Sequence, residues 1–226
     1  MNIDEHSGMG RTVSDFKEVW VLVIFFAADA IAAIPSLNAW LVTNFGLTRA
    51  NPLGIVMSIV VYDGWANVVV LFLASVAYVL GTMGLSQPAR RQASRLYLLL
   101  TLTSAIVGGL AWYLTGLYPA IPVHGTSGVV MAAIGMTYPP TGMAMGLLVL
   151  RYRKLRGADR AAKRSWFRRN GFAPYWGFVL NLVCLAVAFF AVIFVTGNEI
   201  VHGVSFTVAM LVSLGYYFTV YRNAKV

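Results

Sequence analysis

Residues 96–117 read LYLLLTLTSAIVGGLAWYLTGL, a run of 22 residues without a charged side chain. As a helix this run spans about 33 Å at ~1.5 Å per residue, enough to cross the ~30 Å hydrocarbon core of a bilayer. Hydrophobic residues make up 59% of the 226-residue chain and charged residues 11%, whereas a soluble domain carries about a quarter charged residues. The sequence therefore predicts an all-α, polytopic membrane protein. Its six predicted transmembrane helices cover residues 19–42, 60–82, 96–117, 127–150, 175–196 and 200–221.

Two of these spans carry features that interrupt a helix. The apolar run 54–81 would extend about 42 Å as one helix, which exceeds the ~30 Å hydrocarbon core, and Asp63-Gly64 interrupts it. We therefore expect residues 50–62 to lie at the outer interface and residues 64–82 to form the second span proper. The fourth span contains Pro139-Pro140. Proline removes an intrahelical hydrogen bond, so a break or kink is expected halfway along this span.

The placement of basic residues predicts the orientation of the chain. Segment 151–170 holds nine of the 17 Lys and Arg residues, and the loop 83–95 holds three more. By the positive-inside rule, these two loops and both termini are cytoplasmic. The expected organisation is a cytoplasmic tail (1–18), one six-helix membrane domain (19–221) and a second cytoplasmic tail (222–226).

The net charge of +9 is mostly a consequence of this topology. It predicts anionic lipid headgroups at the cytoplasmic face as a partner, rather than nucleic acid. We expect the chain to be an integral, multi-pass protein of the prokaryotic plasma membrane.

Ser127 and His202 are the residues that most strongly predict chemistry. Ser127 lies in Gly125-Thr126-Ser127-Gly128 at the start of the fourth span, and His202 lies at the start of the sixth. A hydroxyl and an imidazole are costly in hydrocarbon unless they have partners. Both predicted helices start at the outer face, so the two side chains are expected at matching depth. The pair therefore predicts a nucleophile and its general base.

Catalysis by a serine also needs donors for the developing oxyanion. Asn67 lies near the outer end of the second span, and its amide offers two N–H groups. The free backbone N–H groups of a helix start favour negative charge near Ser127, and Gly125 permits close backbone approach there. We therefore expect Asn67 and Gly125 to stabilise the transition state.

Small residues predict how the spans around this site pack. His202, Ser205 and Ala209 share one face of the sixth span at spacings of three and four. Gly128 lies beside Ser127 on the fourth span. Small residues let transmembrane helices approach closely, so Gly128, Ser205 and Ala209 are expected to bring Ser127 beside His202.

Each of these polar residues also has a structural interpretation. Ser127 could cap its helix, and His202 or Asn67 could form an interhelical hydrogen bond. Asp29, inside the first span, is a functional candidate by default, with pairing to a polar neighbour as the alternative. Cys184 stands alone in the fifth span and is expected to pack in the core, so neither a cofactor nor a metal is predicted. The remaining candidates are expected to be solvated: His6, His124 and Glu199.

These motifs resemble those of the rhomboid family of intramembrane serine proteases, over residues 54–215. The stretch from Arg95-Leu96-Tyr97 to Gly108-Gly109, and then residues 122–128, resembles the third span and the Gly-x-Ser-Gly nucleophile motif of that family. Residues 202–209 resemble its His-x-x-Gly-x-x-x-Gly motif, with Ser205 and Ala209 in place of the glycines. The resemblance implies a rhomboid-like bundle. In it Ser127 is the nucleophile, His202 is its base, and the backbone N–H of Ser127 contributes to the oxyanion hole.

One departure from the family pattern leaves two functions open. Asn67 and Leu71 stand where the family usually has the His and Asn of a His-x-x-x-Asn motif. The resemblance implies hydrolysis of peptide bonds in or near transmembrane segments of other membrane proteins. The lost donor at Leu71 favours the alternative, a catalytically inactive rhomboid-like protein that binds transmembrane helices. A small transporter is disfavoured, because the spans lack paired charges and inverted halves.

Overall fold

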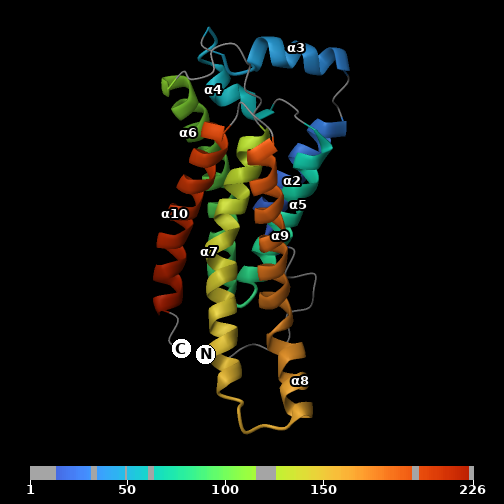
Figure 1. Cartoon of the computed structure of the whole chain (residues 1–226), viewed down its shortest axis with the longest axis vertical. Helices are drawn as coiled ribbons and strands as arrows, with labels where there is room; N and C mark the ends of the chain where they lie inside the picture. Colours follow the sequence, from blue (N-terminus) through green and yellow to red (C-terminus); the bar gives the residue numbers. More distant parts are fainter. Residues whose placement is uncertain are drawn as a thin grey trace.

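The computed structural model describes residues 14–31, 35–48, 50–60, 64–115, 126–194 and 199–223. These residues are almost entirely helical (Figure 1). The elements are α2 (Lys17–Ile31), α3 (Pro35–Phe45), α4 (Gly54–Met57), the 3-10 helix η1 (Ser58–Val60), α5 (Trp65–Thr82), α6 (Gln87–Thr115), α7 (Thr126–Arg153), α8 (Arg160–Asn170), α9 (Phe172–Phe194) and α10 (Glu199–Asn223).

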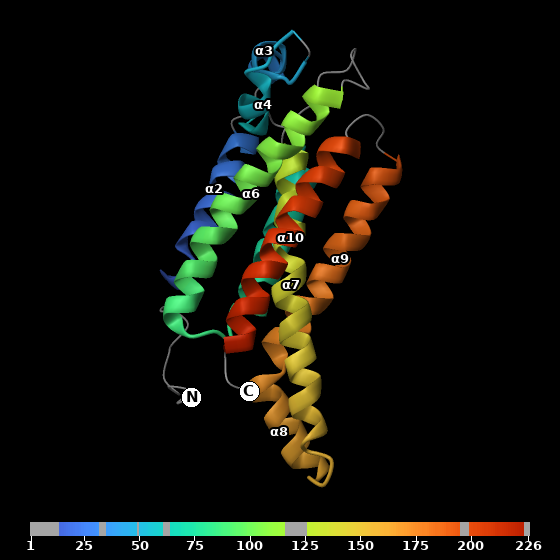
Figure 2. The same ribbon diagram turned by 90° about the vertical axis from the view of Figure 1, so that its left-hand side faces the viewer.

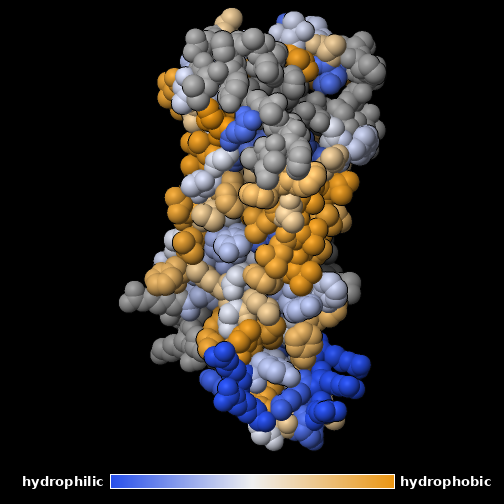
Figure 3. Space-filling model, viewed as in Figure 1, coloured by the Kyte–Doolittle hydropathy of each residue, from blue (hydrophilic) through white to orange (hydrophobic). Residues whose placement is uncertain are grey.

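Within the described residues, five helices are long and apolar enough to cross a membrane: α5, α6, α7, α9 and α10. On the face shown in Figure 3, mostly apolar residues cover the middle of the molecule, and hydrophilic residues gather at the lower end, where α8 lies. An apolar surface is what a lipid environment requires, because no water is available there to solvate polar groups. The all-helical fold expected from the sequence is confirmed, and the five apolar helices indicate a multi-pass membrane protein, whereas the sixth span and the orientation stay predictions.

The first predicted span, 19–42, is not one helix. Helix α2 ends at Ile31 and a separate helix, α3, begins at Pro35. Proline disfavours helical geometry in the residue before it and is well suited to the first position of a new helix. Helix α3 lies across the upper end of the bundle rather than along it (Figures 1 and 2).

The interruption expected at Asp63-Gly64 agrees with the structure, although Asp63 itself lies outside the described residues. Short elements α4 and η1 occupy residues 54–60, and α5 begins at Trp65. Gly64 has a φ of 124°, a conformation that strains any residue with a Cβ. A glycine at this position therefore allows the backbone conformation that precedes the start of α5.

The expected break at Pro139-Pro140 does not occur, because α7 runs without interruption from Thr126 to Arg153, whereas the alternative, a kink, stays a prediction. The two prolines remove the donors that would reach the Met136 carbonyl from three and four residues further on. The Ser213 hydroxyl of α10 donates to that carbonyl at 2.8 Å. A side chain from a neighbouring helix thus replaces the bond that the prolines remove, as in other membrane helices.

Helix α7 is the centre of the bundle and contacts α5, α6, α9 and α10. Its hydroxyl side chain Thr137 donates to the carbonyl of Ala74 on α5 at 3.3 Å. A Cβ built on Gly135 would lie 3.2 Å from Ala209 of α10. A second contact in each pair, Gly81 with Thr141 and Gly128 with Val201, shows that residue numbers increase in the same direction on all three helices. Helices α5, α7 and α10 therefore run parallel and start at the same, upper end.

Many of the basic residues lie at the lower end of the bundle, opposite the starts of α5, α7 and α10. The Tyr221 hydroxyl of α10 donates to Gly81 near the end of α5, and Arg90 of α6 pairs with Asp15 just before α2. The described start and end of the chain therefore lie at one end of the bundle, with α8 (Figure 2). Helix α8 forms inside the predicted loop 151–170, where the Asp159 carboxylate caps it by accepting from the Ala162 N–H at 2.7 Å.

Candidate functional site

Ser127 lies in the first turn of α7, at the upper end of the bundle. Helix α7 begins at Thr126, and Ser127 is 8% exposed. The first backbone N–H groups of any α-helix have no hydrogen-bond acceptor within the helix itself. Gly125, expected to serve the oxyanion, and His124 fall in the segment 116–125, outside the described residues.

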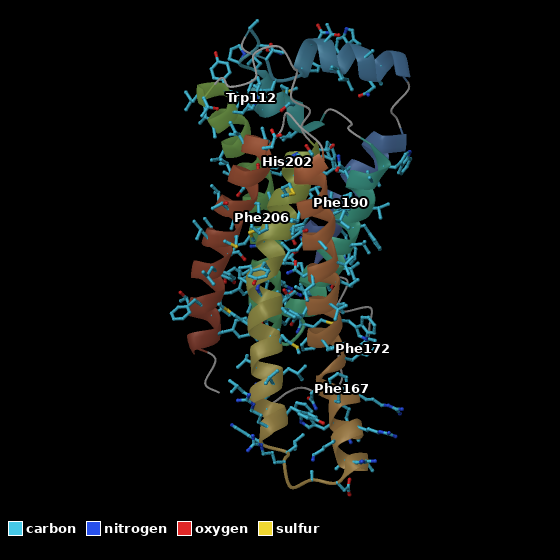
Figure 4. The ribbon with its side chains drawn as sticks, viewed as in Figure 1. Trp112, Phe167, Phe172, Phe190, His202 and Phe206 are labelled. Atoms are coloured by element: carbon cyan, nitrogen blue, oxygen red, sulfur yellow. The ribbon has the colours of Figure 1, made fainter. Side chains whose placement is uncertain are left out.

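His202 lies one turn into α10, which begins at Glu199. Its side chain is buried, at 5% exposure, and it sits near the upper end of its helix, where Trp112 of α6 also lies (Figure 4). Among the described residues, neither ring nitrogen of His202 has a hydrogen-bond partner. A buried imidazole usually hydrogen-bonds through at least one nitrogen, so this ring can still accept a proton or donate to another group.

Glycines allow α6 and α7 to approach α10 at the depth of these two residues. A Cβ on Gly128 would lie 3.1 Å from the Val201 side chain, and a Cβ on Gly108 would lie 2.7 Å from the Val201 carbonyl and collide with Ser205. Any larger residue at Gly108 would push the helices apart. Ser127 directly precedes Gly128, and His202 directly follows Val201, so both lie next to the contact between α7 and α10.

Several polar atoms gather at this three-helix contact. Within the described part of the chain, the buried hydroxyls of Thr126 and Ser205 and the indole N–H of Trp112 have no hydrogen-bond partner, like the His202 ring. Leaving such groups unsatisfied costs about 1–3 kcal/mol each. These unsatisfied groups all lie near the upper ends of α6, α7 and α10, and each can still form a hydrogen bond.

The structure brings the helices of Ser127 and His202 together but does not join the two side chains. Ser127 makes other interactions, and no hydrogen bond links its hydroxyl to the His202 ring. Hydrogen bonds between catalytic groups are often long or absent before a substrate binds and tighten in the complex. The structure thus places the starts of α7 and α10 next to each other, and a catalytic pairing of Ser127 with His202 stays a prediction.

Asn67 lies in the first turn of α5 and is half-buried. Thr137 of α7 contacts Ala74 of α5. Ser127 lies ten residues before Thr137, and Asn67 lies seven residues before Ala74. Because the helices run parallel, Asn67 and Ser127 differ in depth by about 4.5 Å, at ~1.5 Å per residue. Leu71, one turn deeper, is 2% exposed and packs in the core, so it adds no donor.

The remaining candidates lie away from this contact or outside the described side chains. The side chain of Asp29 is among those that the structure does not describe. Cys184 is buried and packs in the hydrophobic core. Among the described residues, no group of three or more His, Cys, Asp and Glu side chains could hold a metal ion.

Sequence reasoning missed Trp112 and Thr126 as polar members of this region. Trp112 is fully buried and packs with Leu47 and Val201. Its only sequence signal was its position one turn after Gly108-Gly109, on the same helix face. Thr126 was visible inside the Gly-Thr-Ser-Gly motif, but its burial, at 5% exposure, was not.

Comparisons with family models, with curated proteins and with solved structures found no match to this chain. The rhomboid resemblance therefore depends on its motifs alone.

Proposed function

We propose that this protein is a rhomboid-type intramembrane serine protease that hydrolyses peptide bonds in or near the transmembrane segments of other membrane proteins. The observation that carries the proposal is the meeting of two buried helix starts. Ser127 and His202 are 8% and 5% exposed, and the residues next to them, Gly128 and Val201, are in contact. A hydroxyl and an imidazole at one depth of a membrane bundle have a ready use as nucleophile and base.

In the proposed reaction, the Ser127 oxygen attacks the peptide carbonyl carbon while His202 takes the hydroxyl proton. The carbonyl oxygen becomes an oxyanion, held by backbone N–H groups at the start of α7 and by the Asn67 amide. Collapse of this intermediate breaks the C–N bond, and the leaving amine receives the proton from His202. Water then attacks the Ser127 ester, with His202 again taking and returning the proton.

The proposal includes a topology. Helix α2 is the sixth crossing segment, completing the six-helix domain of residues 19–221. The basic end of the bundle, with the tails 1–18 and 222–226, faces the cytoplasm of a prokaryotic cell, because nine cations in segment 151–170 resist translocation. The site then opens toward the outer face, from which water reaches it.

A second candidate function is supported by two observations. Leu71 supplies no oxyanion donor, and Ser127 makes no hydrogen bond to His202. A rhomboid-like protein that binds transmembrane helices without cutting them needs neither. The apolar outer surface of this bundle would suffice to bind the transmembrane helix of another protein.

Labelling with a serine-reactive fluorophosphonate separates the two functions. We expect the wild type to be labelled and to cleave a model transmembrane substrate. Ser127→Ala should lose the label, and Ser127→Ala and His202→Ala should each lower cleavage by about 10⁴-fold or more. Ser165→Ala on α8 is the matched control and should keep both activities. Cleavage at the wild-type rate by Ser127→Ala would exclude this serine as the nucleophile.

A further inference from the structure

The start of α6 carries a charge cluster that the proposed protease reaction does not use. Asp15, whose side chain is fully buried, accepts from Arg90 Nη2 at 2.7 Å and from Arg91 Nε at 3.1 Å. Gln87 donates to the same carboxylate at 3.2 Å. Burial raises the pKa of the Asp15 carboxyl, but the hydrogen bonds from Arg90, Gln87 and Arg91 outweigh burial and leave the pKa below its usual value.

A second acid, Glu18, repeats this arrangement one turn further along. Glu18 accepts from the Ser94 hydroxyl at 2.8 Å, and its carboxylate lies 3.6 Å from Arg95 Nε. Arg91 thus forms a hydrogen bond through Nε and Arg95 forms an ion pair through Nε, while 58% and 69% of their side chains stay exposed. Among the described residues, the terminal amino groups of both arginines have no hydrogen-bond acceptor.

These two arginines line one open groove with Gln87, Pro88 and Gln92, and its volume is ≈ 470 Å³. The cluster holds four cations, Lys17, Arg90, Arg91 and Arg95, against Asp15 and Glu18, so its net charge is +2. Helix α6 has 29 residues and would extend about 43 Å, longer than the ~30 Å hydrocarbon core. Its first turns therefore reach the headgroup layer.

We propose that this groove binds the phosphate headgroup of an anionic membrane lipid. Guanidinium groups match phosphate oxygens with paired N–H donors. The Nε contacts to Asp15 and Glu18 already restrict both arginine side chains, which lowers the entropy lost when a phosphate binds. The Gln87 and Gln92 amides add neutral donors at the groove wall.

The arginines of α8 provide a comparison within the same chain. Arg164, Arg168 and Arg169 also line an open groove. There the described contact of Arg169 is to the Ser165 hydroxyl of its own helix, and no acid holds any of the three in place within the described residues. Helix α8 thus offers charge without the restricted geometry, and it is the control site.

Lipid binding by the full-length protein in neutral detergent tests the proposal. Native mass spectrometry measures the dissociation constants of phosphatidylglycerol and phosphatidylcholine. We expect the wild type to bind phosphatidylglycerol at least tenfold more tightly. Arg91→Gln combined with Arg95→Gln should weaken that binding about 25-fold, since each arginine near a headgroup contributes about fivefold. Arg164→Gln combined with Arg168→Gln should change it by no more than about twofold, as expected for a charge outside the site.

Gln92→Glu is a second test that does not depend on the two arginine substitutions. It adds a negative charge to the groove and leaves the contacts of Asp15 and Glu18 in place. This variant should weaken phosphatidylglycerol binding at least fivefold. Wild-type binding by Gln92→Glu and by the Arg91/Arg95 variant would overturn the proposal, as would an equal loss in the α8 control. Displacement of the lipid by excess inorganic phosphate would assign the groove to free phosphate instead. The outcome is independent of proteolysis, since none of these residues lies near Ser127.

Discussion

Ser213→Ala should destabilise the bundle because it removes the donor that compensates for Pro139-Pro140. Ser213 is fully buried, and Met136, whose carbonyl it serves at 2.8 Å, is 1% exposed. Leaving a buried acceptor without a donor costs about 1–3 kcal/mol, and interhelical hydrogen bonds in membranes contribute about 0.6–1.7 kcal/mol. We expect a loss of about 1–1.5 kcal/mol, measured by reversible unfolding in mixed micelles.

Two further variants make this test specific. Ser205→Ala removes an equally buried hydroxyl from the same helix, one that has no hydrogen-bond partner among the described residues, so it should cost less than about 0.5 kcal/mol. Pro140→Ala restores the N–H that reaches Met136 within α7. In that background Ser213→Ala should become nearly neutral. An equal cost of Ser213→Ala with and without Pro140 would refute the compensation.

Three other changes test the site, the charge cluster and the topology. Asn67→Ala should lower kcat about 100-fold or more with little change in KM if its amide holds the oxyanion, and Leu71→Asn should raise activity; wild-type turnover by Asn67→Ala would make Asn67 a packing residue. The Asp15 carboxyl has a lowered pKa, so its contribution to stability is complete above its ordinary pKa of about 3.9 and is lost as the pH falls through the lower folded value. The stability difference between wild type and Asp15→Asn should therefore shrink below about pH 4, and a constant difference in thermal unfolding would contradict this. In a Cys184→Ala background, Arg160→Cys should react with an impermeant thiol reagent only after the cells are opened, and labelling in sealed cells would reverse the topology.

Hydropathy and charge alone determined the helices, because lipid leaves a spanning backbone no partner outside its own helix. The apolar runs predicted α7, α9 and α10 to within three residues at each end, whereas α5 begins five residues after the start of the predicted span 60–82 and α6 begins nine residues before the start of the predicted span 96–117. The first span was misplaced because hydropathy does not register a change of direction. Pro35, where α3 begins, favours a helix start, and a count of hydrophobic residues does not record this property.

The motifs likewise indicated Ser127 and His202, since a hydroxyl and an imidazole stand out in an apolar run. Only the tertiary structure decided what these residues contact. The Met136 carbonyl, left without a donor in α7 by Pro139-Pro140, accepts from Ser213, 77 residues away. Arg91 donates to Asp15, 76 residues away. Such pairings are set by helix register and side-chain rotamers, which become defined only when the helices pack. For the same reason, the sequence could place Ser127 and His202 at one depth but could not determine whether they share a hydrogen bond.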